Sequence, residues 1–228
     1  MRKLSLAERR WNDLWARLGV TDKAWVRRQF RRMLKRYGER HRAYHIWDHI
    51  EYGLDMLFRH AHLAENFDAI LIAWFLHDVV YHTKTRGKRA LSNETLSANY
   101  ADRLLRRAGV PAEFRAMVRD LILATLHNPE LVTTRDQMLM VDIDWSVLGW
   151  PWERYIVYVA KVRREYAKYT DKAFGIGRLG WIAKARWRDR HFHLDEFNDA
   201  YNEQVKANLA REAKEYEDVD FAKNWELP

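Results

Sequence analysis

The chain has 228 residues, of which 48% are hydrophobic and 14% aromatic, and it contains no cysteine. This length supports one sizeable core, and the composition is that of a folded chain rather than a disordered one. The lack of cysteine excludes disulfides, thiolate zinc sites and a cysteine nucleophile, so any metal must be bound by histidine and carboxylate side chains. The longest apolar stretch is too short to cross a bilayer and the N-terminus lacks an apolar signal-peptide core, so we expect a soluble cytoplasmic protein without a membrane partner.

The net charge of +8 is concentrated in the N-terminal part of the sequence. Residues 1–42 hold fourteen Lys and Arg against four Asp and Glu, a balance of +10, whereas the remainder has a balance of −2. Six of these cations form a stripe beside an apolar helical face: Arg27, Arg28, Arg31, Arg32, Lys35 and Arg36. Such a stripe is either the solvated face of an amphipathic helix or a contact surface for an anionic partner such as nucleic acid, and the sequence leaves both open.

Helical patterning extends through almost the whole chain. Only nine Gly and four Pro interrupt it, and no alternating run of β-branched residues predicts a strand. We expect helices over residues 6–18, 22–37, 47–62, 67–81, 93–108, 111–126, 152–170, 178–188 and 195–216. The predicted fold class is all-α. We expect a single domain over residues 1–228, with basic N-terminal helices in 1–42, a core in 43–150, and C-terminal helices in 151–228 packed on that core.

A His-Asp dipeptide, His77-Asp78, lies in the otherwise apolar run Ala69–Tyr81. The run is hydrophobic on every side, which predicts an interior helix. An ionised carboxylate is costly in such surroundings unless a partner stabilises it, and a metal ion is the strongest partner available. A neighbouring neutral imidazole favours a metal further.

Three other segments offer metal-donor side chains. His45 and His49 are four residues apart, so they share a face if the helix there extends back far enough. A predicted helix ends at His127. Asp142 and Asp144 interrupt an apolar segment; two positions apart on a helix they point in nearly opposite directions, so one is a ligand and the other a cap or an outer partner.

Together these residues resemble the HD superfamily of metal-dependent phosphohydrolases, and more narrowly a bacterial group described as predicted HD phosphohydrolases. The resemblance runs from about residue 11 to 215. It rests on Tyr44-His45-x-x-x-His49-Ile50, Trp74-Phe75-x-His77-Asp78-Val79-Val80-Tyr81, Asn93-Glu94-x-x-Ser97-Ala98, Thr125-x-His127, Asp142-x-Asp144-x-Ser146-x-Leu148-Gly149, Arg164-Glu165-Tyr166 and Gly177-Arg178. It implies an HD-domain-like helical bundle with additional C-terminal helices.

The resemblance further implies that His49, His77, Asp78 and a later aspartate coordinate a divalent cation. We assign the later aspartate to Asp144, with Asp142 as the alternative, and His45 is the alternative to His49. Few further histidines are available between the His-Asp dipeptide and the last aspartate, which favours one ion. Such ligands suit Mn, Fe, Ni, Co, Zn or Mg.

The implied activity is hydrolysis of a phosphate ester, for instance a nucleotide, by metal-activated water. Asp78 is expected to belong to the catalytic centre. Glu94 is a candidate general base, or else an acid in the first turn of a helix. His127 could protonate a leaving group, or else cap its helix. Candidate phosphate contacts are Lys84, Arg86, Arg164 and Arg178. The expected partner is a small phosphorylated substrate, and a homodimer is the commonest assembly. The alternative is a non-catalytic HD module that binds nucleic acid or another anionic partner through its basic N-terminal helix.

Overall fold

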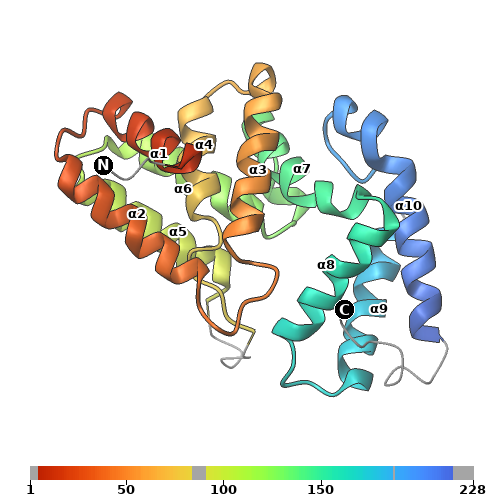
Figure 1. The fold of residues 1–228 in the computed structure, drawn as a ribbon. Coiled ribbons are helices and arrows are strands. Elements are labelled where there is room, and N and C mark those ends of the chain that lie inside the picture. Colours follow the sequence, from red (N-terminus) through yellow and green to blue (C-terminus); the bar gives the residue numbers. More distant parts are fainter. Residues whose placement is uncertain (1–4, 84–90, 187, 218–228) are drawn as a thin grey trace. The chain divides into compact units, whose positions relative to one another are not determined.

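The computed structural model describes residues 5–83, 91–186 and 188–217, and this part of the chain folds into helices without a strand, as Figure 1 shows. The predicted all-α class is therefore confirmed. No helix in these residues is long and apolar enough to span a membrane. The α-helices are α1 (Leu6–Arg17), α2 (Lys23–Tyr37), α3 (Trp47–Arg59), α4 (Phe67–Leu76), α5 (Asn93–Arg107), α6 (Ala112–Ala124), α7 (Arg135–Trp145), α8 (Trp152–Glu165), α9 (Asp171–Arg186) and α10 (Asp195–Glu217). Short 3-10 turns are η1 (Ala61–Leu63), η2 (Pro129–Leu131) and η3 (Ser146–Gly149).

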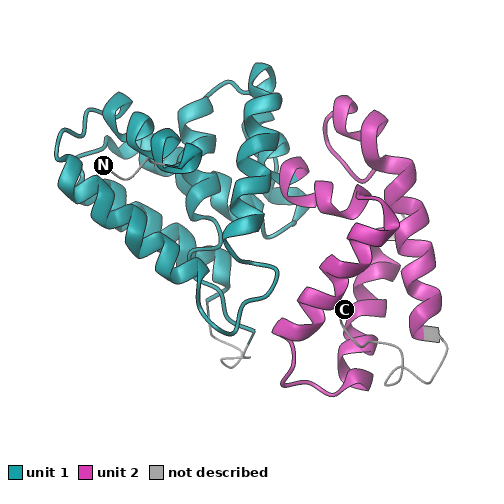
Figure 2. Ribbon diagram, viewed as in Figure 1, with its two compact units in different colours: residues 1–141 teal, residues 142–228 magenta. Residues whose placement is uncertain are grey.

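The chain divides into two compact units, coloured separately in Figure 2. Residues 1–141 form the first unit, which holds α1 to α6 and most of α7. Residues 142–228 form the second unit, which holds the last turn of α7, η3 and α8 to α10. The single domain expected from the sequence stays a prediction.

Helix α4 forms the centre of the first unit. Its residues Ala69–Leu76 are all buried, so it is apolar on every side, as the sequence predicted. It contacts α1, α3, α5 and α6. Trp11 of α1 packs edge-on against Phe75 at 5.1 Å between ring centroids, and the Trp11 indole N–H donates to the carbonyl of Val26 at the start of α2. Large aromatic side chains therefore tie the N-terminal helices to α4.

The second unit is built around η3 and α10. Gly149 allows η3 to approach α10, because a Cβ atom there would lie 2.6 Å from Cβ of Tyr201. Asn208 of α10 donates its amide to the carbonyls of Leu148 and Trp150, both at 2.8 Å. These buried bonds satisfy backbone oxygens at the end of η3 and fix its position on α10.

Four predicted helices differ from the structure by three residues or more at one end, and α7 was not predicted as a helix. The helix predicted over 47–62 ends at Arg59, the one over 67–81 at Leu76 and the one over 152–170 at Glu165. The helix predicted over 178–188 begins earlier, at Asp171. Gly175, Gly177 and Gly180 lower the helix propensity of this segment, which is why its first turns were not predicted.

Candidate metal centre

The His-Asp dipeptide lies directly after α4 rather than inside a helix, which corrects the sequence-based expectation. His77 is the C-cap of α4, and the next residues form a turn. The backbone N–H of Val79 donates to the carbonyl of Leu76 at 3.1 Å, which tightens the end of the helix. The buried dipeptide therefore stands at the carboxyl end of the most apolar helix, where the helix dipole is negative and favours a cation.

Side chains from other helices satisfy the backbone carbonyls at this end of α4. The Tyr37 hydroxyl donates to the carbonyl of Phe75 at 3.0 Å. The guanidinium of Arg42, whose side chain is fully buried, donates to the carbonyls of Asp78 at 2.7 Å and Val79 at 3.3 Å. These bonds replace the helical partners that the last carbonyls lack, so the turn that carries His77 and Asp78 is fixed from outside the helix.

The orientation of the His77 ring leaves its Nε2 atom facing the site. Nδ1 lies 2.9 Å from the carbonyl oxygen of Trp74, and because a carbonyl only accepts, Nδ1 carries the proton. In the neutral ring Nε2 therefore has a lone pair. A backbone carbonyl that binds one ring nitrogen in this way is the usual support of a metal-ligating histidine.

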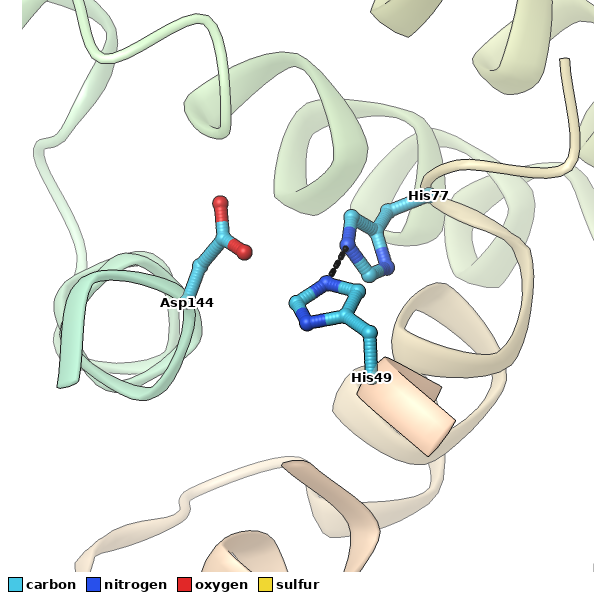
Figure 3. Close-up of side chains that lie close together, drawn as sticks. All are labelled: His49, His77 and Asp144. Atoms are coloured by element: carbon cyan, nitrogen blue, oxygen red, sulfur yellow. Dashed lines mark hydrogen bonds between the residues drawn. The ribbon is translucent and has the colours of Figure 1, made fainter. Parts of the chain in front are cut away.

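Three donor atoms converge beside the end of α4. His77 Nε2 lies 3.2 Å from His49 Nε2, the pair joined in Figure 3, and 3.1 Å from Asp78 Oδ2. The remaining separation, from His49 Nε2 to Asp78 Oδ2, is 3.6 Å. All three side chains are buried. The first unit by itself thus gathers two imidazoles and one carboxylate around a single point.

The carboxyl group of Asp78 is ionised although it is buried. Burial raises the pKa of the carboxyl, but the nearby imidazoles of His77, His45 and His49 outweigh that effect and hold the pKa well below its usual range. A carboxylate that stays ionised in an apolar interior is a suitable ligand for a cation.

The spacing of these three atoms fits a divalent metal ion. A point equidistant from all three lies about 1.9 Å from each, slightly less than the 2.0–2.2 Å of zinc bonds to nitrogen and oxygen. His49, His77 and Asp78 are therefore close enough together to hold a divalent ion between them. Two nitrogen donors and one oxygen favour Mn, Fe, Co, Ni or Zn over Mg, which prefers oxygen ligands.

Helix α3 presents His49 through a close contact with α4. A Cβ atom at Gly53 would lie 1.7 Å from Cζ2 of Trp74, so only glycine lets the indole ring fit there. The Trp74 ring packs against the imidazoles of His49 and His77 at centroid distances of 5.4 and 4.6 Å. Its N–H donates to the carbonyl of Ile50. The indole therefore separates the two helices at the spacing that brings the two imidazoles together.

His45, the alternative ligand, precedes α3 and is not part of it. The helix begins at Trp47, so the expected shared helical face with His49 does not form. The His45 ring stacks on Tyr81 at 4.1 Å between centroids and lies 6.0 Å from the ring of His49. It borders the centre, and its role as a ligand stays a prediction.

The two candidate aspartates differ in their surroundings within the second unit. Asp142 is fully buried, and its carboxylate accepts from the backbone N–H of His193 at 2.8 Å and of Leu194 at 2.8 Å. Burial raises the pKa of Asp142 to about 7, although these N–H groups act in the opposite direction. Asp142 therefore holds the turn before α10, whereas Asp144 is half-buried.

Glu94 and His127, the expected acid-base residues, lie at helix ends. Glu94 is half-buried in the first turn of α5 and makes no side-chain hydrogen bond or ion pair with the described residues. His127 has a φ of 55° and follows the last turn of α6, with its N–H bonded to the carbonyl of Ala124. A histidine in the left-handed region ends a helix in this way. The catalytic roles of both residues stay predictions.

Of the four expected phosphate-binding residues, the structure describes Arg164 and Arg178. Lys84 and Arg86 lie outside the described residues. Arg164 is exposed on α8. Arg178 donates to both carboxylate oxygens of the fully buried Glu212, at 2.7 and 3.1 Å, so its charge is already compensated inside the second unit. A role of Arg164 or Arg178 in phosphate binding stays a prediction.

Several residues that fix the chain around the His-Asp dipeptide were not predicted from the sequence. Arg42 holds the turn after α4, but it stood among thirteen other N-terminal cations that no pattern separated from it. Ser97 bonds to the backbone of Val80, and Asn93 bonds to both the N–H and the carbonyl of His82. The segment Asn93–Ala98, noted only as part of the resemblance, thus fixes the chain that follows the His-Asp dipeptide.

Comparison of the chain with protein-family models, with curated proteins and with solved structures returned no match. The buried donor group, rather than any relative, is therefore the basis for a functional assignment.

Proposed function

We propose that the protein is a metal-dependent phosphohydrolase in which His49, His77, Asp78 and Asp144 bind one divalent metal ion. The observation that carries this proposal is the convergence of His49 Nε2, His77 Nε2 and Asp78 Oδ2 within 3.6 Å of one another. Two imidazole nitrogens and a carboxylate oxygen that converge in an apolar interior form a donor set suited to a cation.

Asp144 is the proposed fourth ligand because of its place on α7. This helix starts in the first unit, where Asp136 accepts from the backbone N–H groups of Glu65 and Asn66 just before α4. Asp144 follows Asp136 by about two helical turns on the same helix and keeps its carboxylate half-buried. Asp142, by contrast, is already engaged at the start of α10.

A divalent ion at this place would acidify a water molecule and offset negative charge on a phosphoryl oxygen. The chain's own residues orient the donors for that purpose. Trp74 fixes the tautomer of His77 through its carbonyl, and Arg42 holds the backbone of Asp78. Glu94 is the proposed proton acceptor, because it is a half-buried carboxylate whose helix also carries Asn93 and Ser97, which bind the chain after Asp78.

The first experiment measures bound metal in the purified protein and in three variants. We expect about one divalent ion per chain in the parent protein, and a loss of affinity of more than about 100-fold in His77→Gln and Asp78→Asn. His60→Gln is the matched control, because the Nδ1 atom of His60 also binds a backbone carbonyl, that of Met56 at 2.8 Å, at the end of α3. Circular dichroism verifies folding.

The second experiment measures phosphate release from a panel of nucleotides and sugar phosphates with each candidate metal. The proposal expects release that requires metal and that disappears in His77→Gln. Full metal retention in both ligand variants would overturn the site. Bound metal without phosphate release from any substrate would overturn the enzymatic assignment in favour of a non-catalytic metal-binding module.

A further inference from the structure

A cavity in the first unit lies between α2 and α5, two helices labelled in Figure 1. Its volume is about 430 Å³, within the range of small-molecule sites. None of its lining residues belongs to the proposed metal centre. They are Gln29, Arg32, Lys35, Arg36, Glu39, Tyr100, Arg103, Leu104 and Arg107.

The cavity is strongly basic. Its lining includes three cations from α2 and two from α5, whereas Glu39 is the single acidic side chain among the lining residues. The carboxylate of Glu39 is shared, since it lies 3.3 Å from Arg36 and also accepts from Arg42 at 3.3 Å. Within the described part of the chain, Lys35, Arg103 and Arg107 form neither a side-chain hydrogen bond nor an ion pair.

The placement of these cations works against the stability of the unliganded protein. Arg32 and Arg36 are four residues apart on α2, and Arg103 and Arg107 are four apart on α5, so each pair repels along its helix. Because cations of both helices line one cavity, the cations of α2 also repel those of α5. If the basic residues of α2 were only a solvated surface stripe, there would be no reason for cations of α5 to line the same cavity. An anion in that space would be attracted by all five cations and would offset their mutual repulsion.

We propose that this cavity binds a small molecule that carries several phosphate groups in a row. Guanidinium groups bind phosphate oxygens in pairs, and five cations match a polyphosphate better than a single phosphate. Tyr100 and Leu104 supply the aromatic and apolar part of the wall. The small volume of the site, about 430 Å³, favours a compact ligand over a nucleic-acid backbone, which would follow an extended stripe.

The test is titration calorimetry with inorganic tripolyphosphate on protein dialysed first against chelator and then against chelator-free buffer. Two double variants remove the same charge from the same helices. Arg32→Gln with Arg107→Gln removes lining cations, whereas Arg31→Gln with Arg106→Gln removes their exposed neighbours, which do not line the cavity. We expect saturable binding of one molecule per chain, weakened at least about tenfold in the first variant and less than about twofold in the second.

Three results would overturn the proposal. One is the absence of saturable binding to the parent protein. Another is an equal loss in both double variants, which would indicate general attraction by the basic helix. The third is tighter binding of a single-stranded oligonucleotide than of tripolyphosphate, with both variants impaired, which would indicate a nucleic-acid surface. Thermal melts of the two variants should agree with the parent, because the substituted side chains are exposed.

Discussion

The contact between Gly53 and Trp74 makes the metal centre sensitive to a single methyl group. In Gly53→Ala, the new Cβ would lie 1.7 Å from Cζ2 and 2.0 Å from Cε2 of the indole ring, so the ring or a helix must move. The ring cannot move without cost, since its N–H donates to the carbonyl of Ile50 at 3.0 Å and its faces pack against the imidazoles of His49 and His77.

The magnitude follows from three contributions. Overpacking a tight core costs about 1–3 kcal/mol, and loss of the buried indole hydrogen bond costs about 1–3 kcal/mol. Replacement of glycine by alanine inside a helix returns about 1 kcal/mol. We therefore expect Gly53→Ala to lower the free energy of unfolding by about 1–5 kcal/mol. We also expect it to weaken metal binding, because the two imidazoles no longer keep their separation.

Urea unfolding and metal titration test this reasoning together. Gly180→Ala is the control, since a Cβ atom there meets nothing within 4 Å and the variant should be as stable as the parent or more stable. Gly53→Ala combined with Trp74→Phe should recover part of the stability, because the smaller ring lacks the atoms that clash. A Gly53→Ala protein with the parent's stability and metal affinity would refute the proposed role of this contact.

Three further predictions concern other parts of the chain. Asp142→Ala should destabilise the second unit by about 2–3 kcal/mol in urea melts while metal binding persists, because buried N–H groups lose their acceptor; Asp144→Ala should instead lose metal without that cost. Burial lowers the pKa of His191, so the unfolded state takes up a proton near pH 6.5 that the folded state does not. The contribution of His191 to stability should therefore fall as the pH drops below about 7, opposite in sign to that of Asp142, whose raised pKa adds stability over the same range, and His191→Gln should remove the His191 contribution in melts at each pH. Arg42→Gln should weaken metal binding about 10–100-fold, whereas Arg40→Gln, at an exposed position, should not.

The sequence predicted most of the helices because their apolar positions recur with helical period. The predicted helix ends were wrong where tertiary contacts determine them. The apolar pattern of α4 continues through Val79 and Val80, but side chains of Arg42 and Ser97 bind the backbone there and end the helix at Leu76. Such partners lie some 17 to 38 residues away in sequence, and periodicity carries no information about them.

The buried polar groups at the end of α4 could be predicted from the sequence. A histidine and an aspartate beside an apolar run indicate buried polar groups whatever the fold, so His77 and Asp78 were identifiable from local composition. The ion pair of Arg178 with Glu212 was not predictable, because the two residues lie 34 positions apart in the sequence. The pairing of Glu39 with Arg42 was not predictable either, since a single acid among many cations forms no distinctive sequence pattern.

Glu39 explains why the basic cavity keeps its excess charge. Arg42 is fully buried, and a buried guanidinium requires a nearby carboxylate, which Glu39 provides at 3.3 Å. The same guanidinium holds the carbonyl of Asp78, so Glu39 cannot turn fully toward the cavity without weakening the turn that carries a proposed metal ligand. Among the described lining residues, the one acid is therefore shared with the guanidinium that holds the turn after α4, and a bound anion would supply further compensating charge.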